Sequence, residues 1–439
     1  MRCVYRPFLV WLVAGFAWSP AYSAAELSPV EQQIVAAVKA HSPEALQFLE
    51  RTVNVNSGTL NAAGVRDVGK LFSDELAGLG FATRWAEMPP EMKRAGHLIA
   101  TREGKQGKQG KRIMLIGHLD TVFEKDSPVQ LWDRKGDRVR GQGVSDMKGG
   151  NVIAVEALRA LRQVGVLDNM TIAVVFSGDE ERVGDPVEVA RADMISVAKQ
   201  SDIALSFESV SRDREGREAV VIGRRAQSRW WLTVTGKQGH SSHVFSQASG
   251  YGAIYEIARI LNAFREQLIE ANLTFNPGYI LGGTEVTVDD GSSKGTAFGK
   301  NNVIANTATV SGDMRYLTNE QVERVRQKMR AIVADSLPGT SAKIRFLDRY
   351  PPMSPTAGNL GLLEQYSKVS TDAGLGPVTP VPPGERGAGD VQFVAPFVDS
   401  LDGLGAFGRG EHSPNEELEL ASIERGAIRA ALLIYRLTR

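Results

Sequence analysis

The sequence predicts an α/β protein built from two domains, with one domain inserted into the other. Three runs of apolar residues, at 112–120, 171–181 and 202–209, end in polar residues and alternate with helical segments. Strands that are apolar throughout and separated by helices are typical of a parallel sheet that helices cover on both faces. From about residue 223 the strands become alternating and amphipathic, which indicates a second, antiparallel sheet.

Helical periodicity separates and follows the three predicted strands. Apolar residues recur at helical spacing over 147–165, and Gly165 ends that segment. Two more helices are predicted near 358–373 and over 421–438. The first domain is therefore expected to be a mixed, largely parallel sheet covered by helices.

Residues 223–340 are expected to form the inserted domain, between the two parts of the first domain at 26–222 and 341–439. The pattern predicts strands and helices in the order β-α-β-β-α-β, over 229–243, 250–272, 279–288, 302–317, 319–337 and 342–349. This order is that of a small α+β module of the ferredoxin-like type.

The composition is that of a globular protein without a strong net charge. The 439 residues include 51 Lys and Arg against 51 Asp and Glu, and 42% are hydrophobic. Because no large net field is present, nothing points to nucleic acid or to an anionic lipid surface as a partner.

Residues 1–25 have the pattern of a signal peptide. Arg2 and Arg6 precede a short apolar run, and small residues at 21–25 would form the cleavage site. The run is about half of the ~20 residues that cross a bilayer, so no membrane span is expected after cleavage. The mature chain is expected to be periplasmic or secreted. The only cysteine, Cys3, lies in this segment, so a metal site in the mature chain must use His, Asp and Glu.

Acids and a histidine follow all three predicted parallel strands. The first strand ends at His118 and Asp120, the second at Glu180 and Glu181, and the third at Glu208. In open α/β sheets, ligands bind outside the carboxyl ends of the strands, so these five side chains are expected to converge on one edge. Their convergence indicates a metal site, whereas any one of them alone is weak support.

Asp146 stands immediately before the predicted helix at 147–165 and allows two interpretations. It is either a simple N-cap or a carboxylate that bridges two metal ions at the start of the helix. Gly149 and Gly150 weaken the first turn of that helix, which indicates that another group approaches closely there.

The other candidates also have ordinary structural alternatives. His118 and Asp120 could lie in a plain loop, Glu180 and Glu181 in a solvated turn, and His412 on the surface. Adjacent residues of an extended chain point in opposite directions, so one glutamate of the pair could bind metal while the other accepts a proton.

Taken together, five short stretches resemble the co-catalytic zinc metallopeptidase family that includes glutamate carboxypeptidase, aminoacylase, succinyl-diaminopimelate desuccinylase and peptidase T. They occur in the family's order, as GHLDTV, GQGVSDMKGG, SGDEE, SFES and GEHSPNE. The resemblance covers essentially the whole mature chain and is strongest to glutamate carboxypeptidase. It implies a zinc-exopeptidase-like catalytic domain and assigns the inserted domain as a lid or dimerisation domain.

The resemblance implies two zinc ions per subunit, bridged by Asp146. One ion would also be bound by His118 and Glu208, and the other by Glu181 and His412.

The same resemblance implies a role for two further acids. Asp120 would orient the His118 imidazole, and Glu180 would be the general base that activates the attacking water. The peptide bond between Asp146 and Met147 would be cis.

In the inserted domain the resemblance extends to residues that contact the substrate. His240, rather than His243, would reach the active site of the partner subunit and stabilise the oxyanion. Asn302 and Arg315 would bind the substrate, and Arg386 in the later part of the first domain would line the pocket.

The resemblance thus implies a zinc-dependent carboxypeptidase that forms a homodimer and hydrolyses, by metal-activated water, the amide bond next to a C-terminal, glutamate-like residue. An N-acyl amino acid amidohydrolase or a dipeptidase is the alternative within the same chemistry. A noncatalytic binding protein on the same fold is the alternative from another class, and the filled metal and base positions disfavour it.

Overall fold

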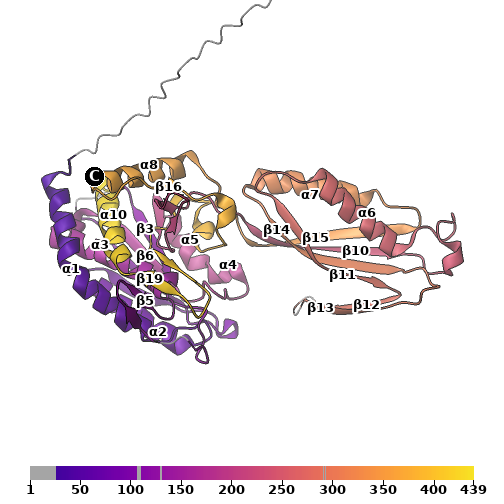
Figure 1. Cartoon of the computed structure of the whole chain (residues 1–439), viewed down its shortest axis with the longest axis horizontal. Coiled ribbons are helices and arrows are strands. Elements are labelled where there is room, and N and C mark those ends of the chain that lie inside the picture. The colour runs from indigo at the N-terminus through magenta and orange to yellow at the C-terminus, as the bar shows by residue number, and fades with distance from the viewer. Residues whose placement is uncertain (1–25, 106–109, 129–130, 290, 292) are drawn as a thin grey trace, which may run out of the picture.

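The computed structural model describes residues 26–105, 110–128, 131–289, 291 and 293–439. The expected signal peptide, residues 1–25, lies outside these residues. Figure 1 shows two lobes side by side, which correspond to the first domain and the inserted domain. Within the described ranges, no helix is both long and apolar enough to cross a membrane.

A mixed, mostly parallel sheet forms the centre of the first domain, which confirms the predicted fold class. Its strands lie in the order β1-β2-β6-β3-β7-β17, with bounds Ala82–Ala86, His97–Arg102, Ile172–Ser177, Ile113–His118, Ile203–Ser206 and Asp399–Leu401. Strands β6, β3, β7 and β17 run parallel, whereas β2 pairs antiparallel with β6 and with β1. The carboxyl ends of the parallel strands therefore share one edge of the sheet.

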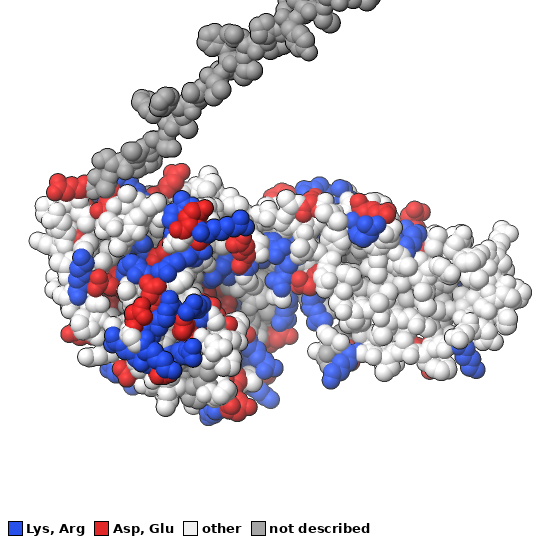
Figure 2. Space-filling view, in the orientation of Figure 1, with Lys and Arg blue, Asp and Glu red and all other residues white. Residues whose placement is uncertain are grey.

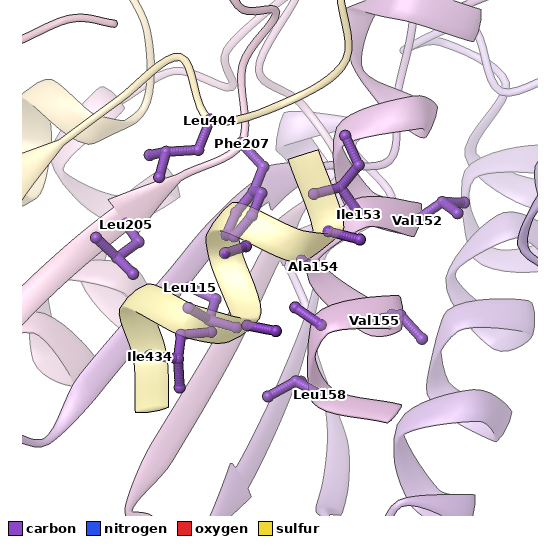
Figure 3. Packing of buried hydrophobic residues seen from close by; sticks show 14 of the residues in the cluster. Leu115, Val152, Ile153, Ala154, Val155, Leu158, Leu205, Phe207, Leu404 and Ile434 are labelled. Carbon is purple, nitrogen blue, oxygen red and sulfur yellow. The ribbon is translucent and has the colours of Figure 1, made fainter. Parts of the chain in front are cut away.

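Side chains of β3 alternate between two hydrophobic clusters, one on each face of the sheet. Leu115 packs in the larger cluster, while Met114 and Ile116 pack in the smaller one. Helices α3 and α10 cover the larger cluster, where Leu115 and Ile434 lie together (Figure 3). Both faces of the sheet are buried, which is why its parallel strands are apolar throughout.

Helices pack on both faces of this sheet and around its edges. Their bounds are α1 Pro29–Val53, α2 Ala62–Gly78, α3 Gly149–Gln163, α4 Val187–Ala190, α5 Ala192–Ala198, α8 Ala357–Asp372, α9 Val391–Val394 and α10 Ala421–Leu437. The first of them begins at a capping box, in which the Ser28 hydroxyl and the Glu31 carboxylate each accept a backbone N–H from the other residue.

Short strands and turns complete the first domain. One small sheet has the order β16-β9-β8 and another β18-β19-β5-β4; the bounds are β4 Asp133–Lys135, β5 Arg138–Arg140, β8 Ser211–Arg212, β9 Glu218–Val220, β16 Thr379–Pro380, β18 Gly408–Arg409 and β19 Glu417–Glu419. Single helical turns lie at Pro90–Met92, Leu167–Asn169, Ser241–His243 and Pro383–Glu385, the third of them in the inserted domain.

The inserted domain has the predicted β-α-β-β-α-β order. Its antiparallel sheet is arranged β11-β14-β10-β15, with bounds Thr274–Gly283, Thr307–Arg315, Gln227–Gly236 and Thr340–Tyr350. Trp230, Leu232 and Val234 of β10 form one core with helices α6 (Gly252–Gln267) and α7 (Asn319–Ala334). A hairpin of β12 (Glu285–Asp289) and β13 (Lys294–Phe298) is added to this module.

Strand β15 extends the inserted domain beyond residue 340, where we expected the chain to return to the first domain. Residues Thr340–Tyr350 pair with β10 along its whole length, so the sheet of the inserted domain continues to Tyr350. A strand was predicted at 342–349. Because this strand pairs with β10, the chain returns to the first domain only after Tyr350.

Candidate metal centre

His118 is the last residue of β3, and its ring is held between two aspartates. The Nδ1 atom lies 2.9 Å from the backbone carbonyl oxygen of Asp120 and 3.6 Å from its carboxylate. The Nε2 atom lies 3.1 Å from Asp146 and 3.7 Å from Glu208. Because Nδ1 contacts the carbonyl most closely, Nε2 is the atom that the ring presents to the acids.

Asp146 lies between the two histidines of the centre, on the turn η2 (Val144–Lys148) that leads into α3. One carboxylate oxygen is 3.1 Å from Nε2 of His118, and the other is 3.1 Å from Nε2 of His412. The peptide bond from Asp146 to Met147 is cis, as the resemblance implied. The N-cap alternative is not observed, because Lys148 holds the N-cap position of α3 without a capping side chain, and the Asp146 carboxylate faces the two histidines.

The five predicted metal ligands lie together in two groups that share Asp146. His118, Asp146 and Glu208 form one group, and Asp146, Glu181 and His412 form the other; in each group the donor atoms lie within 4.8 Å of one another. Imidazole nitrogen and carboxylate oxygen suit zinc and similar divalent ions. In addition, Oε1 of Glu181 is buried and has no hydrogen-bond partner among the described residues, as a free metal ligand would. The donor set therefore fits a dinuclear metal site.

Glu180 and Glu181 are positioned by the carboxylate of Asp120. Oδ1 of Asp120 accepts the backbone N–H of Glu180 at 3.0 Å, and Oδ2 accepts that of Glu181 at 3.1 Å. The hydroxyl of Thr59 donates to Oδ2 at 2.6 Å. Glu181 lies 3.1 Å from His412, whereas Glu180 belongs to neither ligand group.

The acids of the centre are poorly solvated, and their pKa values shift accordingly. Burial raises the pKa of Glu180 well above its usual range, with opposition from His118 and reinforcement from Glu208. Burial also raises the pKa of Glu208 to about 7, reinforced by Asp146. Burial acts in the same direction on Asp146, but hydrogen bonds from His118 and His412 outweigh it and lower its pKa.

The pKa values of both imidazoles are also raised. Hydrogen bonds to Asp146 and Glu181 raise the pKa of His412 to about 11. Burial disfavours the charged form of His118, but hydrogen bonds to Asp120 and Asp146 outweigh it and raise its pKa well above its usual range. An excess of buried carboxylates with positively polarised partners is the setting in which bound dications supply the counter-charge.

Glu416 is a part of the centre that sequence reasoning missed. Its fully buried carboxylate accepts three backbone N–H groups, from Gly143 at 3.1 Å, Ser145 at 2.8 Å and Asp146 at 3.0 Å. Burial raises the pKa of Glu416 to about 8, while the three donors favour its charged form. Glu416 is the last residue of the stretch GEHSPNE, and no local pattern in that stretch indicates a contact with the backbone of residues 143–146.

Asp179 also has a defined place, although sequence reasoning assigned it no role. It is completely buried and receives Nη1 of Arg191 at 2.6 Å, and its second oxygen accepts the N–H of Gly184 at 2.8 Å. Nε of Arg191 donates to Asp390 at 2.7 Å. A buried arginine between two aspartates therefore supports the turn that carries Glu180.

The structure shows the close approach predicted at the start of α3, and the approaching groups are the backbone of one residue and the side chain of another. A Cβ atom on Gly150 would lie 1.9 Å from the carbonyl oxygen of Phe207, which directly precedes Glu208. A Cβ atom on Gly149 would lie 2.7 Å from the side chain of Leu418. Glycine thus lets the helix approach the strand end that carries a candidate ligand.

The residues predicted in the inserted domain lie at two different ends of its sheet. His240 and Asn302 are exposed and adjacent, since the N–H of Ser241 donates to the Asn302 carbonyl at 2.9 Å. Arg315 ends β14 beside the start of β10, where its Nε donates to Asp313 at 2.9 Å. In the described chain, no hydrogen bond or ion pair joins any of these three residues to the metal ligands.

Arg386 is half-buried in the first domain, and its Nη1 lies 3.5 Å from the Ser211 hydroxyl. A second arginine, Arg225, was not predicted. Its guanidinium donates to the hydroxyl of Thr274, at 3.3 Å, and to the carbonyl of Gly384, at 3.5 Å. Since Thr274 pairs with Arg315 across the sheet, Arg225 and Arg315 lie close together at the junction of the two domains, and Arg386 follows the contacted Gly384 by two positions.

The sequence model of one protein family matches most of the chain. The model for peptidase family M20/M25/M40 matches residues 114–436, which include all five candidate ligands. The chain belongs to this family. It is accordingly a metallo-hydrolase that acts on peptide or amide bonds, and the alternative of a noncatalytic binding protein is not supported.

Known relatives are similar along nearly the whole chain. Carboxypeptidase G2 from Pseudomonas sp. (strain RS-16) is 29% identical over 408 residues, which are 90% of this chain and 89% of that protein. A succinyl-diaminopimelate desuccinylase from Variovorax paradoxus is 23% identical over 86% of this chain and 94% of that protein. The crystal structure of the aminopeptidase PepT from Bacillus cereus has the same fold, with a TM-score of 0.68, 16% identity, and coverage of 91% of this chain and 99% of that one.

Proposed function

We propose that this chain is a zinc-dependent carboxypeptidase that hydrolyses the amide bond next to a C-terminal residue of glutamate type. The observation that carries the proposal is the division of roles at the centre. Two ligand groups share Asp146, while Glu180, at the same sheet edge, belongs to neither. The similarity to carboxypeptidase G2 over most of both chains supports the choice of a carboxypeptidase.

Asp146 would bridge two zinc ions, with His118 and Glu208 on one ion and Glu181 and His412 on the other. The separate directions of the two Asp146 oxygens, one toward each histidine, support this assignment. When bound, the two ions would supply Lewis acidity and lower the pKa of a water molecule toward neutrality.

Glu180 would be the general base. Its carboxyl would take a proton from the attacking water and pass it to the leaving amine. Asp120 would position Glu180, Glu181 and His118. Its carboxylate accepts the backbone N–H groups of both glutamates, and its carbonyl oxygen contacts the His118 ring.

Arginines at the domain junction would bind the carboxylates of the substrate. Arg315 would pair with the α-carboxylate, because a guanidinium can hold a carboxylate by two parallel hydrogen bonds. Arg386 and Arg225 lie near it. Among the described residues, Asp313 is the one acidic side chain that pairs with any of these three guanidiniums, and it pairs with Arg315. A cationic junction favours a substrate that carries a second carboxylate.

His240 and Asn302 would act on the substrate of a partner subunit in a homodimer. His240 follows the end of β10 opposite to the domain junction, and a ten-residue strand spans roughly 30 Å. The contribution of these residues to their own centre is therefore disfavoured, whereas a partner could place them there.

The surface of the inserted domain supports the homodimer. Phe245, Ile254, Tyr255 and Ile280 are each about half exposed, and β11 is an unpaired edge of its sheet. The end of this domain that lies far from the first domain shows few charged side chains (Figure 2). An apolar surface next to an open strand edge suits a second copy of the chain. The pattern of residues 1–25 supports a periplasmic or secreted location for the mature enzyme.

An N-acyl amino acid amidohydrolase or dipeptidase is the second candidate. The desuccinylase similarity supports it, because that relative matches over nearly its whole length. The two candidates share the metal centre and Glu180, so they differ only in what the pocket around the junction accepts.

A substrate-profile assay on the zinc-loaded mature protein tests the proposal. The panel contains folate-type and peptide substrates that end in glutamate, matched peptides that end in glutamine, N-acyl amino acids and dipeptides. We expect the highest kcat/KM for the glutamate-terminated substrates, with the matched glutamine peptides at least tenfold lower because one carboxylate is missing. Faster turnover of acyl amino acids or dipeptides would replace the proposal by the second candidate.

A further inference from the structure

Two linkers join the domains, and one buried glutamine holds both of them. The chain enters the inserted domain through 222–227 and leaves it through 350–354, where Arg224 and Met353 pair by two backbone hydrogen bonds of 2.9 and 3.0 Å. Gln392, on α9, is fully buried. Its Nε2 donates to the carbonyl of Arg225 at 3.1 Å and to that of Pro351 at 2.6 Å.

The first linker has a second attachment to the same loop. Nη1 of the buried Arg224 donates to the carbonyls of Gly387 and Ala388 at 2.8 and 3.1 Å, and its Nε donates to Asp402 at 2.7 Å. The Oε1 atom of Gln392 in turn accepts the N–H of Gly389 at 2.9 Å. Residues 387–392 are therefore fastened to the linkers through both backbone and side chain.

The same loop also reaches the turn that carries Glu180. Asp390 accepts Nε of Arg191 at 2.7 Å, and it also accepts the hydroxyl of Ser177 at the end of β6. Arg191 continues to Asp179, which directly precedes Glu180. All of these charged groups are buried, so each depends on its partner for compensation.

We propose that loop 387–392 couples the position of the inserted domain to the position of Glu180. Gln392 is hydrogen-bonded to both linkers, so a shift of the linkers shifts the loop. Asp390 of the loop binds Arg191, and Arg191 binds Asp179 in the turn before Glu180. Gln392 is thus a positioning residue for the reaction, and this role rests on the proposed function of Glu180. A change at the linkers would alter the turn at Glu180 without any contact between Gln392 and the metal ligands.

The variant Gln392→Leu removes both donors to the linkers while nearly preserving side-chain volume. Amide hydrogen exchange over 177–184 is measured on the full mature protein, because Asp120 and Asp179 accept the N–H groups of Glu180, Glu181 and Gly184 there. Loss of these two hydrogen bonds, together with the Oε1 acceptor of the Gly389 N–H, is expected to accelerate exchange of this segment about tenfold. On a glutamate-terminated peptide, kcat should fall about tenfold, while KM changes less than about threefold.

Gln321→Leu is the matched control. Nε2 of Gln321 also donates two hydrogen bonds, to Glu270 and to the carbonyl of Ala271, and its Oε1 accepts the Leu317 N–H, but all three lie within the inserted domain. This variant should leave exchange over 177–184 unchanged. If Gln392→Leu fails to fold, Gln392→Asn, which shortens the reach to the linkers, is measured in its place.

Unchanged exchange over 177–184 in the Gln392 variant would overturn the coupling, and so would equal acceleration in both variants. The exchange readout does not require turnover. A wild-type protein that is inactive on the peptide would therefore count against the proposed carboxypeptidase activity, while the exchange data would still decide the coupling.

Discussion

Glu416 lets the support of the metal centre be tested without touching a proposed ligand. In Glu416→Gln the Oε1 position can keep the N–H groups of Ser145 and Asp146, but an NH2 group replaces Oε2 and faces the N–H of Gly143. One hydrogen bond to a charged acceptor is lost, which costs about 1.5–3 kcal/mol. If the lost free energy destabilises the backbone conformation in which Asp146 binds metal, zinc affinity drops about 10- to 100-fold.

Zinc affinity is measured by competition with a chromophoric chelator at pH 8. At this pH, bound zinc ions near Asp146 favour the charged form of Glu416 in the wild type. Glu417→Gln is the control, since Glu417 pairs with Arg409 and Arg138 and makes no hydrogen bond to the 143–146 backbone among the described contacts. Affinity that differs from wild type by less than twofold in Glu416→Gln would refute the reasoning, as would an equal loss in both variants.

Two further predictions concern stability and packing. Burial raises the pKa of Glu156 to about 7 from 4.5, so the folded state stays protonated while the unfolded state ionises, and stability is lost as pH rises from 4.5 to 7. Glu156→Gln should remove this loss, so in urea unfolding its free energy of unfolding relative to wild type should rise by about 3 kcal/mol between pH 4.5 and 8; a difference independent of pH would contradict this. Gly150→Ala should lose zinc and about 1–3 kcal/mol of stability, because the new Cβ atom would overlap the backbone carbonyl of Phe207. Metal content and thermal unfolding measure the two effects. Gly361→Ala, with open space around the new Cβ, should behave as wild type, and normal zinc content in the Gly150 variant would be the contrary result.

The sequence predicted the sheet and three of the five candidate ligands from strand ends, whereas Asp146 and His412 were assigned as ligands by the family resemblance. Apolar runs define buried parallel strands, and the carboxyl ends of such strands meet at one edge. His118, Glu181 and Glu208 follow three such strands and do lie together with Asp146. Likewise, the β-α-β-β-α-β order of the inserted domain follows from local periodicity alone.

Long-range partners could not be predicted in this way. Asp179, Arg191 and Asp390 form one buried group, but they come from separate parts of the chain and no local pattern joins them. Glu416 reaches the Asp146 turn across 270 positions of sequence. The end of the inserted domain was misplaced for the same reason, since the pairing of β15 with β10 is a long-range contact.

The central claim, that Glu180 moves protons while Glu181 binds metal, is tested most directly by comparing two neighbouring substitutions. Zinc content and kcat are measured for Glu180→Gln and Glu181→Gln on the best substrate of the panel. The account predicts that Glu180→Gln keeps two zinc ions per chain and loses about 10³-fold in kcat, whereas Glu181→Gln loses zinc. Near-normal turnover in Glu180→Gln, or loss of its zinc, would contradict the account.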